Sequence, residues 1–531
     1  MLDLRLTNAT FLTMDPSHPV AHQLGLWQGR IVGVDDAVSA LPARRVIDLA
    51  GATVLPGFID AHVHLAWAGL RERSPDISRA TGVDQVLDVV REAVLRVPVG
   101  EWVDVVGYDQ RRLGRHLTAA ELDRVAAGRR LFVIHDSGHA CAVNTAVLEL
   151  LPASVRHDHG VLTEGGMAAV RALRMPYSIA ELVEAIELAG RTCLREGVTA
   201  VAEAGLGGGL VRHSPVELAA YQQALDTGRL PVRVQAMVAA DALRPRAAHP
   251  GDGLNQALDL GLRTGLGGDR LSIGALKVFT DGGMMARTAA LTEPYVASAD
   301  GVGGVGGLGE LYADPEVLRT QIVDGHRAGW QLAIHAIGDR ALDVTLDAVE
   351  QAQREQPRPG ARHRIEHAGL VRPDQLARFA ELDLTAVVQP SFLYWFGDDY
   401  SAIMGERRAP WLYRGRGFLE HGIRLVGSSD RPVTVGAPLQ AIQFLVERTS
   451  RTGQVIGPDE GISVDAALRA YTAEAARACH WEHILGRLTP GKLADLVVLA
   501  EDPRQVAVDR IADIAILATL VDGEIVNGAF P

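Results

Sequence analysis

Eight short apolar segments recur along the middle of this chain, each bounded by glycine, proline or polar residues. Most are followed by a run whose apolar residues recur at helical spacing, as in 340–356. Eight repeats of strand and helix predict an α/β fold in which parallel strands close into a (β/α)8, TIM-like barrel. The eight segments are GFIDAHVHL (57–65), GVTAVAEAG (197–205), PVRVQAMVAA (231–240), LSIGALKVFTDG (271–282), WQLAIHAIGD (330–339), HRIEHAGLV (363–371), LTAVVQPSF (384–392) and IRLVGSSDRPV (423–433).

A dinucleotide-binding fold is less consistent with the sequence. Its glycine fingerprint follows a strand and opens a helix. The match in this chain, GVGGVG (301–306), lies in a long glycine-rich stretch instead. We therefore interpret that stretch as a loop and as a candidate lid.

The two ends of the chain carry similar hairpin patterns. LWQGRIVGVDD (26–36) and LVDGEIVNG (520–528) each place a glycine turn between apolar strand residues. This pattern predicts one small β-sandwich domain built from both termini. The stretch 69–195 is too long for a single loop and predicts a subdomain inserted after the first barrel strand. The expected domains are residues 1–55 and 486–531 for the β-sandwich, and 56–485 for the barrel with its insertion.

Composition restricts the class of protein. A hydrophobic content of 47% is typical of a globular chain, and a net charge of -13 argues against a nucleic-acid partner. The cysteines Cys141, Cys193 and Cys479 lie far apart without a CxxC, which excludes a disulfide framework and a cysteine zinc site. No run approaches the roughly 18 apolar residues of a membrane span, and the N-terminus lacks a signal-peptide core. We therefore expect a cytoplasmic protein without membrane contact.

Polar residues gather where the predicted strands end. His62 and His64 follow the first strand at positions i and i+2, so their side chains point to the same face. Catalytic residues of such barrels lie at the C-terminal ends of strands. Four imidazoles and a carboxylate, without cysteine, suit Zn²⁺ or a similar divalent ion in a catalytic site. The other members of this set are Lys277 (fourth strand), His335 (fifth), His367 (sixth) and Asp430 (eighth).

Several of these segments also carry family motifs in a fixed order. GFIDAHVH, ALKVFTDG, AIHAIGD, RIEHAG and GSSDRPV resemble the metal-dependent amidohydrolase superfamily along nearly the whole chain. KVFTDG (277–282), RTA (287–289) and GHACAVN (138–144) are similar to its amidohydrolase-3, or YtcJ-like, branch, which includes N-substituted formamide deformylases. Arg431 departs from the family, because many relatives have tryptophan there. The substrate contacts at that position therefore stay open.

The resemblance implies roles for the polar set. A buried ion would be held by His62, His64 and Asp430, and a second ion by His335 and His367. Lys277 would bridge the two ions as a carbamate formed with CO₂, because an ammonium cannot bind a cation but a carbamylated lysine is a carboxylate. The alternative for Lys277 is a plain lysine that orders the site or binds an anionic substrate.

The expected reaction is hydrolysis of a non-peptide C–N bond. A divalent ion lowers the pKa of a bound water towards roughly 7 and stabilises the oxyanion. Asp430 would act as general base and then general acid, with Lys277 as the other catalytic residue. His139, Asn144 and Arg287 are candidate substrate contacts; turn chemistry for the first two and a surface ion pair for Arg287 are the structural alternatives.

The expected substrate is a small linear amide such as an N-substituted formamide. Cyclic-amide hydrolysis or deamination at the same site is the first alternative. A catalytically silent paralogue that serves as a scaffold is the second, and it is disfavoured because no proposed ligand is missing. The sequence leaves open whether one or two ions bind, and it leaves open the oligomeric state, with a homodimer among the options.

Overall fold

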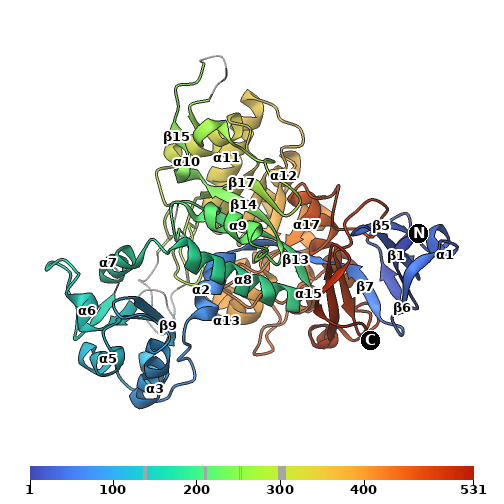
Figure 1. Ribbon diagram of the computed structural model, residues 1–531. Coiled ribbons are helices and arrows are strands. Elements are labelled where there is room, and N and C mark those ends of the chain that lie inside the picture. The colour runs from blue at the N-terminus through green and yellow to red at the C-terminus, as the bar shows by residue number, and fades with distance from the viewer. Residues whose placement is uncertain (136–139, 164, 209–211, 250–251, 253, 297–306) are drawn as a thin grey trace. The chain divides into compact units, whose positions relative to one another are not determined.

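The computed structural model of the chain describes all residues except 136–139, 164, 209–211, 250–251, 253 and 297–306 (Figure 1). The glycine-rich segment 301–306 therefore lies outside the described residues. The chain divides into two compact units. The first consists of residues 1–65, 190–212 and 221–531, and the second of residues 66–189 and 213–220. Within the described part of the chain, no helix combines the length and the hydropathy that crossing a bilayer requires.

The first unit is built on eight parallel strands. Their order in the sheet follows their order in the chain. The eighth strand returns to the first, because the Asp430 amide donates to the His62 carbonyl oxygen and the His64 amide to that of Arg431, each at 2.8 Å. The predicted TIM-like barrel is thus confirmed. The strands are β8 (Phe58–Val63), β13 (Val198–Leu206), β14 (Arg233–Ala239), β17 (Leu271–Phe279), β18 (Leu332–Ala336), β19 (Arg364–His367), β20 (Thr385–Val388) and β21 (Arg424–Gly427).

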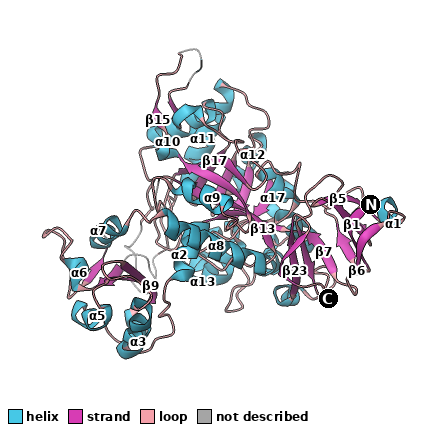
Figure 2. Cartoon of the chain, in the orientation of Figure 1, coloured by secondary structure: helices cyan, strands magenta, loops and turns pink. Residues whose placement is uncertain are grey.

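Helices lie around the outside of the barrel strands (Figure 2). In α11 (Asp339–Glu355), the apolar Leu342, Leu346 and Val349 recur at helical spacing and are buried. Asp339 in its first turn complements the positive end of the helix dipole. The other helices after barrel strands are α10 (Pro315–Arg327), α12 (Pro373–Glu381), α13 (Pro390–Arg408), α14 (Arg416–Glu420), α15 (Pro438–Glu447) and α16 (Val464–Ala470).

The N-terminal end of the barrel is closed by α17 (Ala473–Ala478) and the segment that follows it. Small residues such as Ala200, Ala202 and Ala475 form a buried cluster with Trp481, and their size allows close packing. Gln235 in β14 and Gln331, just before β18, satisfy carbonyl groups at the C-terminal end of this helix, which lack partners inside it. Gln331 Nε2 donates to the Ala478 carbonyl at 2.8 Å, and Gln235 Nε2 to that of Cys479 at 2.7 Å.

Two further sheets of the first unit carry both ends of the chain (Figure 1). The four-stranded sheet has the order β5-β4-β1-β6, and the six-stranded sheet has the order β24-β23-β22-β7-β2-β3. In the second sheet, β7 from near the N-terminus pairs antiparallel with β22 from near the C-terminus. The strands are β1 (Leu2–Thr7), β2 (Thr10–Leu12), β3 (Val20–Ala21), β4 (Leu24–Trp27), β5 (Arg30–Val34), β6 (Ala43–Asp48), β7 (Thr53–Pro56), β22 (Leu496–Leu499), β23 (Ile516–Val521) and β24 (Glu524–Gly528).

A buried guanidinium links the barrel to the six-stranded sheet. Arg233 opens β14, and its Nε and Nη2 donate to both carboxylate oxygens of Asp495 at 2.7 and 2.9 Å. Its Nη2 also donates to Asp522 at 2.5 Å. Both aspartates lie beside strands of the sheet, so one side chain joins the two substructures.

The second unit has a sheet of its own, in the order β12-β11-β10-β9. A capping box formed by Thr118 and Glu121 begins α5 (Ala119–Ala126). The apolar faces of α3 and α5 and the sheet share one buried cluster. Besides α5, the second unit includes α3 (Val83–Val94), β9 (Trp102–Tyr108), α4 (Gln110–Leu113), β10 (Arg130–His135), β11 (Ala140–Val143), α6 (Thr145–Leu148), β12 (Val161–Thr163) and α7 (Gly165–Arg174).

Candidate metal centre

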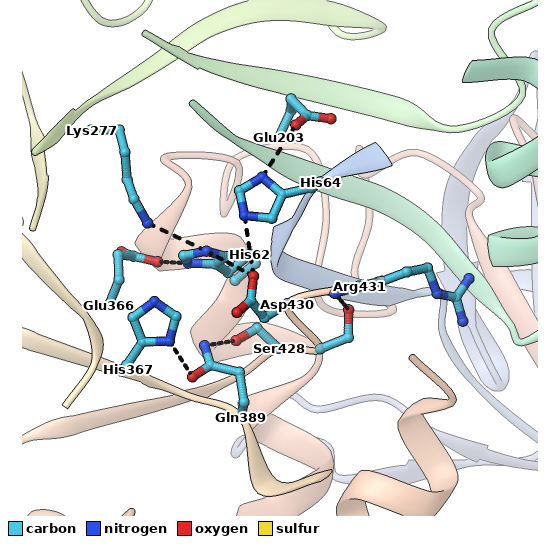
Figure 3. A network of polar contacts seen from close by, with 12 residues as sticks. His62, His64, Glu203, Lys277, Glu366, His367, Gln389, Ser428, Asp430 and Arg431 are labelled. Carbon is cyan, nitrogen blue, oxygen red and sulfur yellow. Dashed lines mark hydrogen bonds and ion pairs between the residues drawn. The ribbon is translucent and has the colours of Figure 1, made fainter. Parts of the chain in front are cut away.

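Two imidazoles and a carboxylate converge where β8 and β21 end (Figure 3). Asp430 Oδ1 lies 3.2 Å from His64 Nε2 and 3.5 Å from His62 Nε2. One ligand atom from each of the three residues lies within 4.8 Å of the others, and all three side chains are buried. A carboxylate oxygen facing two imidazole nitrogens in a buried place is a donor set that fits Zn²⁺ or a similar ion.

The backbone around Asp430 is held in an unusual conformation. Asp430 has a φ of 53°, in the left-handed region that non-glycine residues rarely adopt. Asp60 fixes the preceding residue, because its carboxylate accepts from the Ser429 amide at 3.0 Å and the Ser429 hydroxyl at 2.5 Å. Gly427 is required just before, since a Cβ there would lie 2.1 Å from the Tyr471 ring. These contacts aim Asp430 at the two imidazoles.

The other three polar residues lie beside this group. The rings of His335 and His367 have centroids 4.4 Å apart, and the His367 ring lies 4.9 Å from that of His62. Lys277 Nζ lies 3.3 Å from His62 Nε2 and 4.9 Å from the centre of the Phe279 ring. The structure therefore brings all six predicted strand-end residues into one buried network, and Figure 3 labels five of them, all except His335.

A buried ion pair contacts His62 from the interior of the barrel. Glu366 Oε2 accepts from His62 Nδ1 at 2.5 Å, and Arg364 donates to both oxygens of Glu366. Arg364 also donates to the Ala61 carbonyl oxygen. Because Nδ1 carries the proton, the lone pair of His62 lies on Nε2 and faces Asp430.

The remaining imidazoles also have outer partners. His64 Nδ1 lies 3.8 Å from Glu203 Oε1, and Glu203 is fixed by the Tyr221 hydroxyl at 2.5 Å. His367 Nδ1 bonds the side-chain oxygen of Gln389 at 2.8 Å. His335 Nε2 donates to the Gly282 carbonyl at 3.2 Å. Outer partners of this kind orient metal-binding histidines.

These outer partners are not among the residues that the sequence motifs predict. Glu203, Glu366 and Gln389 occupy strand ends, in VAEAG, RIEH and VVQP, like the predicted ligands. A search for every polar residue at a strand end, and not for histidine, lysine and aspartate alone, would have found all three.

Burial sets the ionisation of the centre. Burial, together with the neighbouring Lys277, holds the pKa of His62 well below its usual range, and burial does the same to His367. Both rings are therefore neutral, the form that binds metal. Burial lowers the pKa of Lys277 to about 8. Burial pushes the pKa of Asp430 up, but the neighbouring His64, His62 and Lys277 side chains more than offset this and leave it below the usual value.

Arg431 does not contribute its side chain to the centre. Its guanidinium extends away from the imidazoles (Figure 3) and pairs with Glu196, with Cys193 Sγ 3.8 Å away. The backbone of Arg431 contributes its carbonyl, which accepts from the His64 amide, and its amide, which donates to the Ser429 hydroxyl at 3.0 Å.

The three candidate substrate contacts have different surroundings. Asn144 lies in the second unit, where its side chain accepts from the Leu131 amide and donates to the Arg129 carbonyl, both at 3.0 Å. These bonds favour its structural alternative. Arg287 is half-buried, with a φ of 55°, and its guanidinium has no ion-pair or hydrogen-bond partner among the described residues. His139 lies outside the described residues.

A family model and several known proteins are similar to this chain over most of its length. The family model described as "Amidohydrolase family" matches residues 45–527. N-substituted formamide deformylase of Arthrobacter pascens is 30% identical over 98% of this chain and 98% of its own length. Putative amidohydrolase YtcJ of Bacillus subtilis (strain 168) is 28% identical over 91% of each chain.

Solved structures agree with this assignment. An uncharacterised metal-dependent hydrolase from Pyrococcus horikoshii superposes with a TM-score of 0.78 at 27% identity, covering 95% of this chain and 99% of that one. A second, from Pyrococcus furiosus, gives a TM-score of 0.77 at 29% identity, covering 94% of this chain and 100% of that one. Family match, relatives and structures cover nearly the whole chain, and the chain belongs to the amidohydrolase family.

Proposed function

We propose that this amidohydrolase cleaves the C–N bond of a small linear amide, such as an N-substituted formamide, by attack of water on the carbonyl carbon. The observation that carries the proposal is the buried convergence of His62, His64 and Asp430. The similarity to the N-substituted formamide deformylase of Arthrobacter pascens supports the linear-amide class.

The donor set suits one or two zinc ions. His62, His64 and Asp430 would hold the first, and His335 with His367 the second. A bound zinc ion supplies a nucleophilic water near neutral pH and polarises the carbonyl oxygen. The residues of the chain provide buried imidazoles and a buried carboxylate.

Asp430 is the proposed general base and acid. Its carboxylate lies at the C-terminal end of β21, where barrel enzymes place catalytic groups. The pKa of Asp430 lies below its usual range, so the group is ionised at neutral pH and can accept a proton from the attacking water. It would then donate that proton to the leaving nitrogen.

Lys277 is the proposed carboxylate bridge. Its Nζ lies 3.3 Å from a nitrogen of His62 and its side chain is buried. Because burial lowers its pKa to about 8, a useful fraction of the amine is neutral near pH 7 and able to react with CO₂. The product is an anionic carbamate that could bridge two cations.

Two residues are proposed on the substrate side. The guanidinium of Arg287, which has no ion-pair or hydrogen-bond partner among the described residues, follows β17 in the chain, close in sequence to Gly282, whose carbonyl contacts His335. We expect Arg287→Met to raise KM with little change in metal content. His139 stays a predicted substrate contact, and His139→Ala should likewise alter KM or substrate preference more than metal content.

The proposal is tested by metal analysis and a substrate panel on the same preparation. We expect between one and two zinc-like ions per chain, loss of activity on chelation, and formate release from N-substituted formamides. Absence of stoichiometric divalent metal after growth with added zinc would contradict the metal mechanism. A metal-loaded protein that releases ammonia from amino-heterocycles but no formate would instead indicate a deaminase.

A further inference from the structure

The four imidazoles of the centre differ in the group that fixes their outer nitrogen. His62 bonds the carboxylate of Glu366 at 2.5 Å, and His64 faces the carboxylate of Glu203 at 3.8 Å. His367 instead bonds the neutral amide of Gln389 at 2.8 Å. A carboxylate partner makes an imidazole a stronger metal ligand, because it raises the basicity of the ring.

Hydrogen-bond polarity shows which end of the Gln389 amide faces His367. The Ser428 hydroxyl donates to the Val388 carbonyl, a pure acceptor, at 3.0 Å. Its oxygen must therefore accept from Gln389 Nε2 at 2.9 Å. The carbonyl oxygen of Gln389 is left for His367, which donates from Nδ1 and keeps its lone pair on Nε2 (Figure 3).

His335 has both a neutral acceptor and a carboxylate near its outer nitrogen. Its Nε2 donates to the Gly282 carbonyl oxygen at 3.2 Å, which leaves the lone pair on Nδ1. Asp281 Oδ1 lies farther away, at 3.4 Å. The carboxylate of Asp281 is already occupied by the amides of Ile337, Ala290 and Gly338 at 2.8 to 3.0 Å.

The centre has two halves, one with His62 and His64 and the other with His335 and His367. Anionic ligands are distributed unequally between these halves. The His62–His64 half includes the carboxylate of Asp430 at 3.2 to 3.5 Å from both rings. Lys277, whose Nζ lies 3.3 Å from His62 Nε2, would serve both halves and is anionic only after carbamylation. The carboxylate of Asp430, together with the contrast between Glu366 behind His62 and Gln389 behind His367, therefore favours a cation in the first half.

We propose that the two halves bind metal with unequal affinity, one ion tightly at His62, His64 and Asp430 and one weakly at His335 and His367, and that Gln389 keeps the second half weak. Gln389 acts as a positioning residue, through His367. The inference rests on the proposed function, because it concerns the ions of that site. It implies that occupancy of the second half follows the free metal concentration.

The test is a metal titration of the full chain. Protein stripped with a chelator is titrated with Zn²⁺ in bicarbonate buffer, with competing chelators to set free zinc, and bound zinc is counted per chain. We expect two steps separated by at least about tenfold in free zinc, the order of an outer-partner effect.

Two exchanges of amide and carboxylate assign the steps. Gln389→Glu should strengthen the weaker step by about tenfold and leave the stronger one unchanged. Glu366→Gln should weaken the stronger step by roughly 10- to 100-fold. Gln222→Glu, an exposed position in the same unit, is the matched control and should change neither step.

Ser428→Ala is the second variant if Gln389→Glu does not fold, as judged by thermal unfolding of the metal-free protein. It removes the oxygen that fixes the Gln389 amide and should weaken the weaker step alone. Equal affinities in the wild type overturn the inference. The inference is also overturned if a folded Gln389→Glu protein binds zinc as the wild type does, or if the wild type and the variant each bind a single zinc ion.

The results that would contradict the proposed function differ from those that would contradict the inference. A protein that binds two ions unequally but hydrolyses no amide retains the inference and loses the function. A hydrolase that binds two ions equally retains the function and loses the inference. If no zinc binds at any concentration, both are wrong.

Discussion

Asp430 combines a buried carboxylate with a left-handed backbone, and it faces two imidazole nitrogens. Asp430→Asn preserves its shape but removes the proton acceptor. We expect the variant to fold, to keep most of its metal and to lose roughly 10²-fold or more in kcat, the size of a general-base contribution. The pH–rate profile of a genuine substrate should also lose its acidic limb.

Asp465→Asn, an exposed exchange of the same kind in α16, is the control and should leave kcat unchanged. If Asp430→Asn turns over within a few-fold of the wild type, Asp430 is a structural turn residue and another base is needed.

Lys277 is the residue whose chemistry depends most on its surroundings. Lys277→Ala should lose metal and activity, because the buried amine and any carbamate made from it disappear. Short carboxylic acids small enough to occupy the space should restore part of both. Metal content and turnover are measured with and without added acid. Unchanged metal content and turnover in the variant would remove the bridging role.

At this scale the sequence predicted the inner residues better than the outer ones. The inner residues lie at strand ends, and position in a strand is a local property. The bond between His62 and Glu366 joins residues 304 apart in the chain, and it depends on how the first and sixth strands face each other across the barrel. No local sequence pattern predicts such a contact between distant parts of the chain.

Among the elements, the eight barrel strands were all predicted within a few residues. The sixth is the informative case, because the predicted segment 363–371 contains a strand of only Arg364–His367. His367 and Ala368 have φ values of 73° and 42°, which end the strand early and turn the His367 ring towards the centre. An apolar pattern does not reveal such a backbone change, since it does not alter residue type.

Two histidines join the end of α10 to the start of β19 through a chain of hydrogen bonds. The Leu332 amide donates to His363 Nδ1 at 3.0 Å, so the proton of His363 is on Nε2 and is given to His326 Nδ1 at 2.8 Å. His326 Nε2 then donates to the Gln356 carbonyl. The bond between the two rings requires both to be neutral, and the bond from Leu332 requires a neutral His363, so an extra proton on either ring would break the chain.

Acid should therefore destabilise this part of the barrel. Burial, with the neighbouring His326, holds the pKa of His363 well below its usual range, and burial lowers that of His326. The unfolded chain gains protons as the pH falls below about 6.5, whereas the folded chain does not. The loss for His363 alone should be about 1.4 kcal/mol per pH unit below that value.

His363→Gln tests this, because glutamine can accept from Leu332 but does not titrate. The fall in thermal midpoint between pH 7.5 and 5.5 should be smaller in the variant than in the wild type. His159→Gln removes an exposed histidine and should leave the pH dependence as it was. An identical pH dependence in all three proteins would show that the buried pair is not responsible.

For the whole molecule, local sequence patterns predicted the hairpins near the two termini but not which strands from the two ends of the chain pair with each other. The patterns at 26–36 and 520–528 correspond to the antiparallel pairs β4–β5 and β23–β24. The pairing of β7 with β22 joins residues from opposite ends of the chain, and composition gives no register for such a contact.

Arg233 should be a major determinant of how firmly the barrel and the six-stranded sheet hold together. Arg233→Met leaves Asp495 buried without its cation, and breaking a buried pair costs about 3–5 kcal/mol. We expect a loss of that order in urea unfolding. Arg44→Met, which removes an exposed pair with Asp3, should cost less than about 1 kcal/mol. Equal effects of the two substitutions would contradict this role of Arg233.

The pairing of β7 with β22 has a consequence for how a cell makes this protein. Synthesis begins at the N-terminus, so β7, His62 and His64 leave the ribosome several hundred residues before β22 and Asp430. During that time the nascent chain presents an open strand edge and a pair of histidines without their carboxylate. A messenger RNA truncated after the codons for α15 (Pro438–Glu447) would yield a chain in which β7 has no β22 to pair with. We expect cellular quality control to treat that chain as incompletely folded.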